Sequence, residues 1–226
     1  MDIKEKEKQL AAIEAVRFLK DDMIVGLGTG STAFYAIQET GRLVAQGLKI
    51  KCVSTSEKTS QLASSLNIPL IDINSIDAID ITIDGADEFT KDLSLIKGGG
   101  GALLREKIVA TITKEEIIIA DSSKLVEKLG LFKLPVEIVP FAYNYVTTQA
   151  GILGGKAVLR QVNNIPFVTD QGNHIIDVDF GLMDDPAGLS TQLNAIEGVV
   201  AHGLFIHLAK KLIMGKGEET ISFTAA

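Results

Sequence analysis

The sequence predicts an α/β fold in which helices cover both faces of a parallel sheet, followed by a smaller α+β module. Short apolar runs alternate with helical segments through the first half of the chain, an order that is typical of parallel sheets. After about Lys128 the pattern changes to short strands, helices and a hairpin signal. The length of 226 residues is enough for one large domain, or for one domain and a small one.

The first half of the chain contains the expected elements of the parallel sheet. A first helix is predicted because four apolar residues recur every three positions, namely Leu10, Ile13, Val16 and Leu19. Strands are then expected at 23–25, 48–53, 68–73, 79–84 and 116–120, with helices at 33–44, 57–66 and 102–112. Ligands of such sheets bind beyond the carboxyl ends of the strands, so the segments after the strands are the candidate site.

The second part of the chain predicts an antiparallel sheet with helices. Strands are expected at 136–139 and 157–161, hairpin arms at 167–169 and 174–178, and helices at 143–149 and 186–196. The turn Asp170-Gln171-Gly172-Asn173 between the two arms is the hairpin signal. The stretch from Gly203 onward is expected to return to the first sheet as extra strands.

Composition narrows the functional class. The net charge of −7 argues against a nucleic-acid partner, because phosphate backbones require a basic face. Cys52 is the only cysteine, which excludes an intrachain disulfide and a thiolate metal cluster. The charged N-terminus does not have the pattern of a signal peptide, and no run approaches the roughly 18 apolar residues that a membrane span needs. We therefore expect a soluble, cytoplasmic protein with no membrane partner.

The first candidate motif is the turn Gly26-Leu27-Gly28-Thr29-Gly30-Ser31-Thr32, between a predicted strand and a predicted helix. Its amide and hydroxyl groups suit a phosphate at the helix N-terminus, although a tight turn with a helix cap has the same pattern. No Gly-Lys-Ser/Thr follows, so it is not a Walker loop. It is also a poor dinucleotide fingerprint, because the third glycine falls one residue early and the next strand ends Cys52-Val53-Ser54, with no acidic residue to hold a ribose.

The second motif, Asp84-Gly85-Ala86-Asp87-Glu88, follows a strand that alternates apolar and polar residues. Three carboxylates at a strand end indicate an acid/base cluster or a metal site, and a solvated acidic turn is the simpler alternative. The spacing excludes a calcium loop, because counting from Asp80 places Lys91 where a bidentate glutamate is required.

The third motif is Lys97-Gly98-Gly99-Gly100-Gly101, followed by Glu106 in the next helix. Four consecutive glycines are costly to order, so they favour a loop whose amides wrap a ligand, with the Lys97 charge at its rim. The Glu106 carboxylate is expected to reach back toward this loop. The alternative is a surface ion-pair stripe that Glu106 forms with Arg105 and Lys107.

The fourth motif, Asp121-Ser122-Ser123-Lys124, ends another predicted strand. Lys124 is therefore expected to overhang the same cleft and to pair with a phosphate, although an exposed lysine after a helix cap is the more common outcome. The three histidines, His174, His202 and His207, show no metal-ligand spacing. No metal site is predicted. The zinc-protease and serine-hydrolase motifs are absent from the sequence.

Taken in order, these four motifs resemble those of the A-type ribose-5-phosphate isomerases. The matching segments are 28–32, 84–88, 97–100 with 105–107, and 121–124, and later stretches at 134–137, 198–200 and 203–205 are also similar. The resemblance implies interconversion of ribose 5-phosphate and ribulose 5-phosphate in the non-oxidative pentose phosphate pathway. It also implies a homodimer that needs no cofactor.

The resemblance further implies a Rossmann-like catalytic domain formed by residues 1–127 and 204–226. A smaller ferredoxin-like domain, residues 128–203, would be inserted into it. The catalytic residues would be Glu106, Asp84 and Lys97. Glu106 would be the base, and Asp84 with Asp87 would hold sugar hydroxyl groups and assist ring opening or hydroxyl proton transfer. Lys97 and the glycine amides would stabilise the enediolate. Substrate binding would involve Thr29, Gly30, Ser31, Thr32, Asp84, Gly85, Ala86, Asp87, Lys97, Gly98, Gly99, Gly100 and Lys124.

Two other functional classes share part of this pattern. A nicotinamide-dependent dehydrogenase would have the glycine-rich turn, but the sequence lacks the acidic residue that holds a ribose. A sugar-phosphate sensor domain would have the phosphate cleft without needing Glu106. Such a regulator would also need a basic DNA-binding module, and the sequence contains none.

Overall fold

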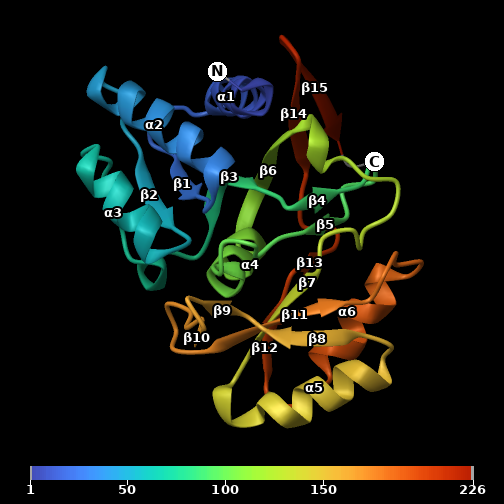
Figure 1. The fold of residues 1–226 in the computed structure, drawn as a ribbon. Coiled ribbons are helices and arrows are strands. Elements are labelled where there is room, and N and C mark those ends of the chain that lie inside the picture. The colour runs from blue at the N-terminus through green and yellow to red at the C-terminus, as the bar shows by residue number, and fades with distance from the viewer. Residues whose placement is uncertain (1, 225–226) are drawn as a thin grey trace.

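The structure, a computed structural model, describes residues 2–224 and is built around a six-stranded sheet (Figure 1). Its strand order is β15-β14-β6-β3-β1-β2. The strands are β1 (Ile24–Leu27), β2 (Lys51–Ser54), β3 (Ile79–Gly85), β6 (Thr113–Asp121), β14 (Lys211–Lys216) and β15 (Glu219–Thr224). Every neighbouring pair is parallel except β14 with β15. The predicted mostly parallel α/β sheet is confirmed, as is the return of the last stretch to this sheet.

Helices cover both faces of the sheet. They are α1 (Ile3–Val16), α2 (Ser31–Ala45), α3 (Glu57–Ser65) and α4 (Leu103–Thr111). Ile117 and Ile119 of β6 pack in one hydrophobic cluster with residues of α1, α2 and α3, whereas Ile118 packs with Ala110 of α4. Successive side chains of a strand point to opposite faces. Because Asp84 of β3 pairs with Ile118, it lies on the face that α4 covers.

A second, four-stranded sheet has the order β12-β7-β11-β8 and is antiparallel throughout. Its strands are β7 (Leu134–Ile138), β8 (Lys156–Leu159), β11 (His174–Asp179) and β12 (Val199–His202), and its helices are α5 (Tyr143–Ile152) and α6 (Pro186–Asn194). The chain order β7-α5-β8-β11-α6-β12 is the ferredoxin-like succession. The predicted small α+β module is therefore present, while its boundaries at 128 and 203 stay a prediction.

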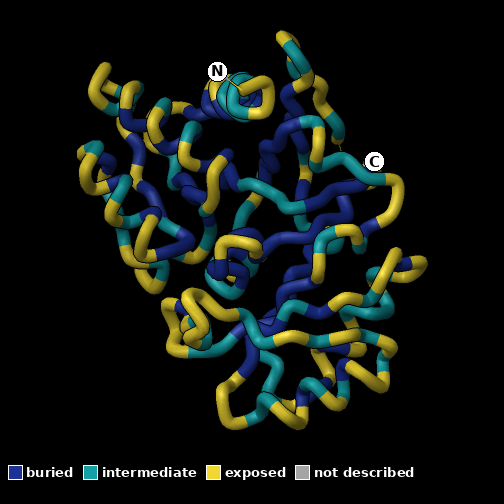
Figure 2. The backbone as a smooth tube through the Cα atoms, viewed as in Figure 1, coloured by how far each residue is buried: buried dark blue, intermediate teal, exposed yellow. Residues whose placement is uncertain are grey.

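The remaining elements are short. They are β4 (Glu88–Phe89), β5 (Leu95–Ile96), β9 (Gln161–Val162), β10 (Ile165–Pro166), β13 (Leu204–Phe205) and the 3-10 turns η1 (Ile73–Ser75), η2 (Ser122–Lys124) and η3 (Pro140–Ala142). The sequence did not predict the small sheet of β13, β5 and β4. Buried backbone is concentrated in the main sheet and at the junction of the two layers (Figure 2).

Two predicted strands are wrong. Residues 68–73 form no strand, because only Leu70 bridges to Cys52 and the Asp72 side chain accepts from Asn74 N, which starts η1. Residues 167–169 are not a regular hairpin arm. Only Val168 bridges to His174, and β11 pairs with β7 and β8 instead.

None of the helices within residues 2–224 combines the length and the apolar composition that crossing a membrane requires.

Candidate active site

A polar pocket lies at the carboxyl ends of β1, β3 and β6, where the sequence predicted a site. Its lining consists of Thr29, Gly30, Ser31, Thr32, Gly85, Ala86, Asp87, Lys97, Gly98, Gly100, Glu106 and Lys124. All of these are predicted site residues. The two other predicted residues adjoin the pocket: Asp84 is buried and forms an ion pair with Lys97, and the amide of Gly99 donates to Asp87.

The turn after β1 is shaped by two close constraints. A side chain on Gly28 would collide with the Asp84 carboxylate, 2.1 Å from its Oδ1, and Gly30 has a φ of +119°. The Thr29 amide donates to Asp84 Oδ1 at 3.0 Å. Helix α2 begins at Ser31, so its first N–H groups have no partner inside the helix and face the pocket side. This arrangement suits an anion.

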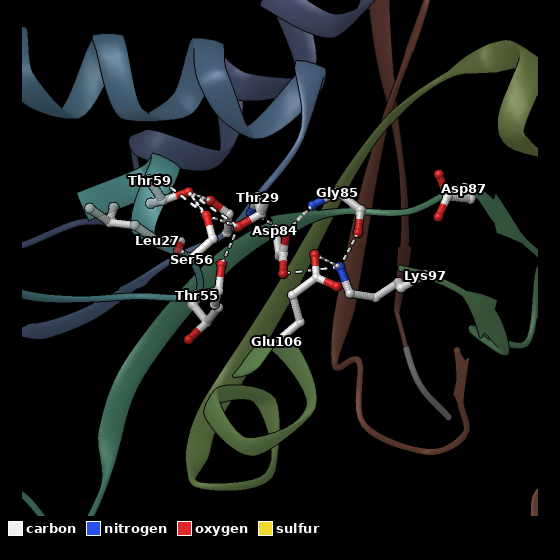
Figure 3. Close-up of polar contacts among 12 residues, drawn as sticks. Leu27, Thr29, Thr55, Ser56, Thr59, Asp84, Gly85, Asp87, Lys97 and Glu106 are labelled. Atoms are coloured by element: carbon white, nitrogen blue, oxygen red, sulfur yellow. Dashed lines mark hydrogen bonds and ion pairs between the residues drawn. The ribbon is translucent and has the colours of Figure 1, made fainter. Parts of the chain in front are cut away.

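A cluster of hydroxyl groups holds the Thr29 side chain (Figure 3). Thr29 Oγ1 lies 2.7 Å from Thr55 Oγ1, 2.9 Å from Ser56 Oγ and 3.2 Å from Thr59 Oγ1. This cluster was not predicted from the sequence. The available signal was the run of hydroxyl residues directly after β2, at the same sheet edge as the glycine turn.

The three carboxylates of the acidic segment at the end of β3 have different surroundings. Asp84 is 1% exposed, and its Oδ1 accepts from the amides of Thr29 and Gly85. Asp87 lines the pocket, and its Oδ2 accepts from Gly99 N at 2.7 Å. Glu88 lies elsewhere and accepts from amides near residue 130. The solvated-turn alternative therefore does not describe this segment.

Lys97 is the central cation of the site, and only 2% of it is exposed. Its Nζ donates to Gly85 O at 2.5 Å and lies 3.0 Å from Asp84 Oδ2 and 3.4 Å from Glu106 Oε1 (Figure 3). Burial alone would lower the Lys97 pKa, but the charges of Asp84 and Glu106 outweigh it and raise that pKa. The expectation of a rim position was wrong, because these acids stabilise the ammonium in the interior.

Glu106 projects from α4 toward Lys97 and is 5% exposed. Its Oε2 has no hydrogen-bond partner within residues 2–224. Burial raises its pKa to about 8, the Lys97 charge opposes that rise, and Asp84 and Asp87 add to it. This is a carboxylate with one unpaired oxygen and a pKa near neutrality, properties that suit a general base.

The surface ion-pair alternative for Glu106 is wrong. Arg105 pairs instead with Glu57 at 2.9 Å. The Lys107 ammonium points the other way and donates to the carbonyl oxygens of His202 and Leu204.

Lys124 reaches the pocket from η2, the turn that follows β6. Asp121 caps this turn by accepting from Ser123 N at 3.0 Å. Glu7 of α1 accepts from Ser122 N at 3.0 Å and from Ser122 Oγ at 2.8 Å. Glu7 was not predicted from the sequence, since nothing in its helical pattern separates it from a solvent-facing acid.

Glu116 is a buried carboxylate near the site that the sequence analysis read only as the start of a strand. It is 1% exposed and its Oε2 has no partner within the described residues. Burial and the charge of Asp84 raise its pKa well above the ordinary value, Lys97 opposes this, and Glu106 adds to it. A charged residue among the isoleucines of β6 was the signal for it.

The described residues contain no group of three or more His, Cys, Asp or Glu side chains placed to hold a metal ion. His202 is fully buried and contacts Lys107 and Ser190.

The chain is similar over most of its length to proteins of one family. The sequence profile of ribose 5-phosphate isomerase A (phosphoriboisomerase A) matches residues 51–219. A protein from Bacillus mycoides named ribose-5-phosphate isomerase A is 53% identical over 209 residues, which cover 92% of this chain and 95% of the relative.

Solved structures agree with this similarity. Ribose 5-phosphate isomerase A from Methanocaldococcus jannaschii is 40% identical, with a TM-score of 0.92 over 96% of this chain and 97% of that one. A D-ribose-5-phosphate isomerase in complex with phospho-erythronic acid is 39% identical, with a TM-score of 0.95 over 99% of this chain and 100% of that one. The chain belongs to the ribose 5-phosphate isomerase A family.

Proposed function

We propose that the chain is an isomerase that interconverts D-ribose 5-phosphate and D-ribulose 5-phosphate. The observation that carries this proposal is the Glu106 carboxylate. It is buried beside Lys97, has one oxygen without a hydrogen-bond partner in the described residues, and lies on the wall of the polar pocket. The family to which the chain belongs supports the choice of substrate.

In the proposed reaction Glu106 removes the proton from C2 of the open-chain aldose and returns it to C1. The negative charge that develops on the enediolate oxygen needs a fixed positive group, and Lys97 and the amides of the glycine loop supply it. Asp87, which lines the pocket, would hold sugar hydroxyl groups. Asp84 keeps Lys97 in position through the 3.0 Å ion pair, in addition to its predicted role in ring opening or hydroxyl proton transfer.

The phosphate group of the substrate would lie at the opposite end of the pocket. Gly30, Ser31 and Thr32 form the start of α2 there, and Lys124 lines the same pocket. The helix N-terminus supplies amide donors and Lys124 supplies charge.

The two alternative functions are not favoured. A sensor domain gives no reason to bury an unpaired carboxylate with a raised pKa beside a lysine. A nicotinamide-dependent dehydrogenase would need an acid for the ribose after β2, where the chain has Ser54, Thr55 and Ser56.

We also propose that the protein acts as a cytoplasmic homodimer in the pentose phosphate pathway. This part of the proposal rests on the family alone. Gel filtration combined with light scattering measures the mass of the assembly, and a monomer would contradict it.

The activity is tested by incubating the protein with ribose 5-phosphate and measuring ribulose 5-phosphate. Reaction in deuterated water adds a second readout, because a single base that moves the proton between carbons exchanges part of it with solvent. We expect ketose formation with deuterium at the migrating position. Binding of ribose 5-phosphate without turnover would contradict the isomerase proposal and favour the sensor.

A further inference from the structure

Arg160 connects the second sheet to the catalytic glycine loop. It follows β8, and its backbone is fixed because its N–H donates to Ile175 O and its carbonyl accepts from Phe167 N. Its guanidinium forms an ion pair with Asp177 of β11, and the Arg160 side chain is only 14% exposed. Two hydrogen bonds join these two side chains, from Nε and Nη2. The remaining terminal nitrogen is therefore held in one direction.

That nitrogen contacts the main chain of the glycine loop. Arg160 Nη1 donates to Gly98 O at 2.9 Å and to Gly99 O at 3.3 Å. Both carbonyl groups therefore point away from the active-site pocket, toward a depression on the other side of the loop. Gly99, Arg160 and Asp177 are among the residues that line this depression.

The direction of the carbonyl groups fixes the direction of the amides. The peptide bonds are trans, so the C=O and N–H of one peptide unit point in opposite directions. The unit between Gly98 and Gly99 shows this directly, because its oxygen accepts from Arg160 while its N–H donates to Asp87 in the pocket. In the next unit, between Gly99 and Gly100, the Gly99 oxygen also accepts from Arg160. The Gly100 N–H of this unit is therefore directed toward the pocket. This N–H has no acceptor within residues 2–224.

We propose that Arg160 is a positioning residue of the isomerase reaction: by holding the carbonyl groups of Gly98 and Gly99, it orients the Gly100 amide toward the oxygen that becomes negative. This inference rests on the proposed function. The charge of the guanidinium also polarises both peptide units, which strengthens their N–H groups as donors. Gly98 O also accepts from Gly101 N at 3.0 Å, so this carbonyl has a second donor. Because glycines have wide conformational freedom, the unit between Gly99 and Gly100 is the one that would sample other orientations without Arg160.

The test compares Arg160→Met with the control Arg42→Met. Both changes keep the apolar stem and break one arginine–carboxylate pair, but Arg42 pairs with Glu39 on the outside of α2, away from the pocket. For each variant we would measure kcat and KM for ribose 5-phosphate, and the affinities for phospho-erythronic acid and for inorganic phosphate. Phospho-erythronic acid carries a carboxylate and a phosphate, so it probes both ends of the pocket.

We expect Arg160→Met to lower kcat by at least about tenfold, since losing one oxyanion donor outright costs about 10²- to 10³-fold. Phospho-erythronic acid should bind more weakly by a similar factor, while inorganic phosphate binding stays as in the control. Guanidinium ion, at concentrations far below those that unfold proteins, should restore part of kcat, because the depression beside Gly99 is open to solvent.

A kcat of Arg160→Met equal to that of Arg42→Met would overturn the inference. The same holds if Arg160→Met binds phospho-erythronic acid and inorganic phosphate more weakly by equal factors and guanidinium ion does not restore kcat. If Arg160→Met does not fold, the same measurements on Arg160→Lys test the inference. This variant keeps the positive charge but loses the planar guanidinium that donates to Asp177 and to the loop at the same time. An inactive wild-type protein would contradict the proposed function itself, and is thereby distinguished from a failure at Arg160 alone.

Discussion

The two ends of the pocket differ in how far their charged groups are removed from water. At the proton-transfer end, Asp84, Lys97 and Glu106 are 1%, 2% and 5% exposed. At the end proposed for the phosphate, Gly30 and Ser31 are exposed and Lys124 is half-buried. Burying a charged group is costly unless the group is paired with an opposite charge. At the proton-transfer end Lys97 is accordingly paired with both Asp84 and Glu106. In the proposed function the second end binds the phosphate group, whose charge is hydrated before it binds, through main-chain amides and one lysine.

This difference separates catalysis from recognition. Changes at the buried end should alter kcat, because they affect groups that act as charge develops. Changes at the phosphate end should alter KM. The predictions below test this division.

The largest effect is expected for Glu106→Gln, which keeps the shape of the side chain and removes the base. The kcat for ribose 5-phosphate should fall by at least about 10²- to 10⁴-fold, while phospho-erythronic acid binding changes little. Solvent-deuterium exchange at C1 or C2 measures proton removal directly. Exchange at the wild-type rate would mean that another residue removes the proton, with Asp84 the first candidate.

Lys97→Met should lower kcat by about 10²-fold or more, through lost stabilisation of the oxyanion. It also leaves Asp84 and Glu106 buried without their cation, so thermal unfolding must be measured in parallel. If the variant is folded at the assay temperature and keeps the wild-type kcat, Lys97 does not stabilise the oxyanion.

The sequence predicted the site residues whose position follows from their own segment of the chain, and it did not predict features that depend on contacts between distant segments. Asp84 and Glu106 were predicted because a strand end and a helix start are visible in the chain itself. The burial of Lys97 was not, because it depends on the two acids that approach from β3 and α4. The strand predicted at 68–73 failed because this apolar run forms a single bridge to β2, at Leu70, before Asp72 starts η1. Arg160 had no local signal, since its contact with the glycine loop joins two layers of the fold.

The pH dependence of kcat/KM should reflect the protonation of Glu106 at the buried end of the pocket. Glu106 must lose its proton before it can act as a base, and burial raises its pKa to about 8. The value of kcat/KM should therefore rise about tenfold per pH unit below pH 8 and level off above it. Asp84→Asn removes a negative charge that raises this pKa, so the rise should move to lower pH. A profile that is flat from pH 6 to pH 9 in the wild type would contradict the assignment.

At the phosphate end, Lys124→Ala should raise KM for ribose 5-phosphate by roughly tenfold and leave kcat nearly unchanged, because one charge-assisted contact is lost equally from substrate and transition state. Ser123→Ala is the matched control on the same turn, since its side chain bonds Asp121 and does not line the pocket. An unchanged KM in Lys124→Ala would remove this residue from phosphate recognition.

The smallest effect is expected from chelation, which should leave kcat and KM unchanged. The positive charge that an enediolate requires is already present at the buried end as the Lys97 ammonium, 3.0 Å from Asp84 Oδ2 and 3.4 Å from Glu106 Oε1. A divalent ion at these carboxylates would have to displace that ammonium or share its ligands, and two cations at such short range repel strongly in a buried site. The measurement is turnover after exhaustive dialysis against a chelator, with and without added Mg²⁺, Mn²⁺ or Zn²⁺. If chelation abolished turnover and one ion restored it, the segment from Asp84 to Glu88 would be a metal site, and the charge stabilisation assigned to Lys97 would belong to the metal.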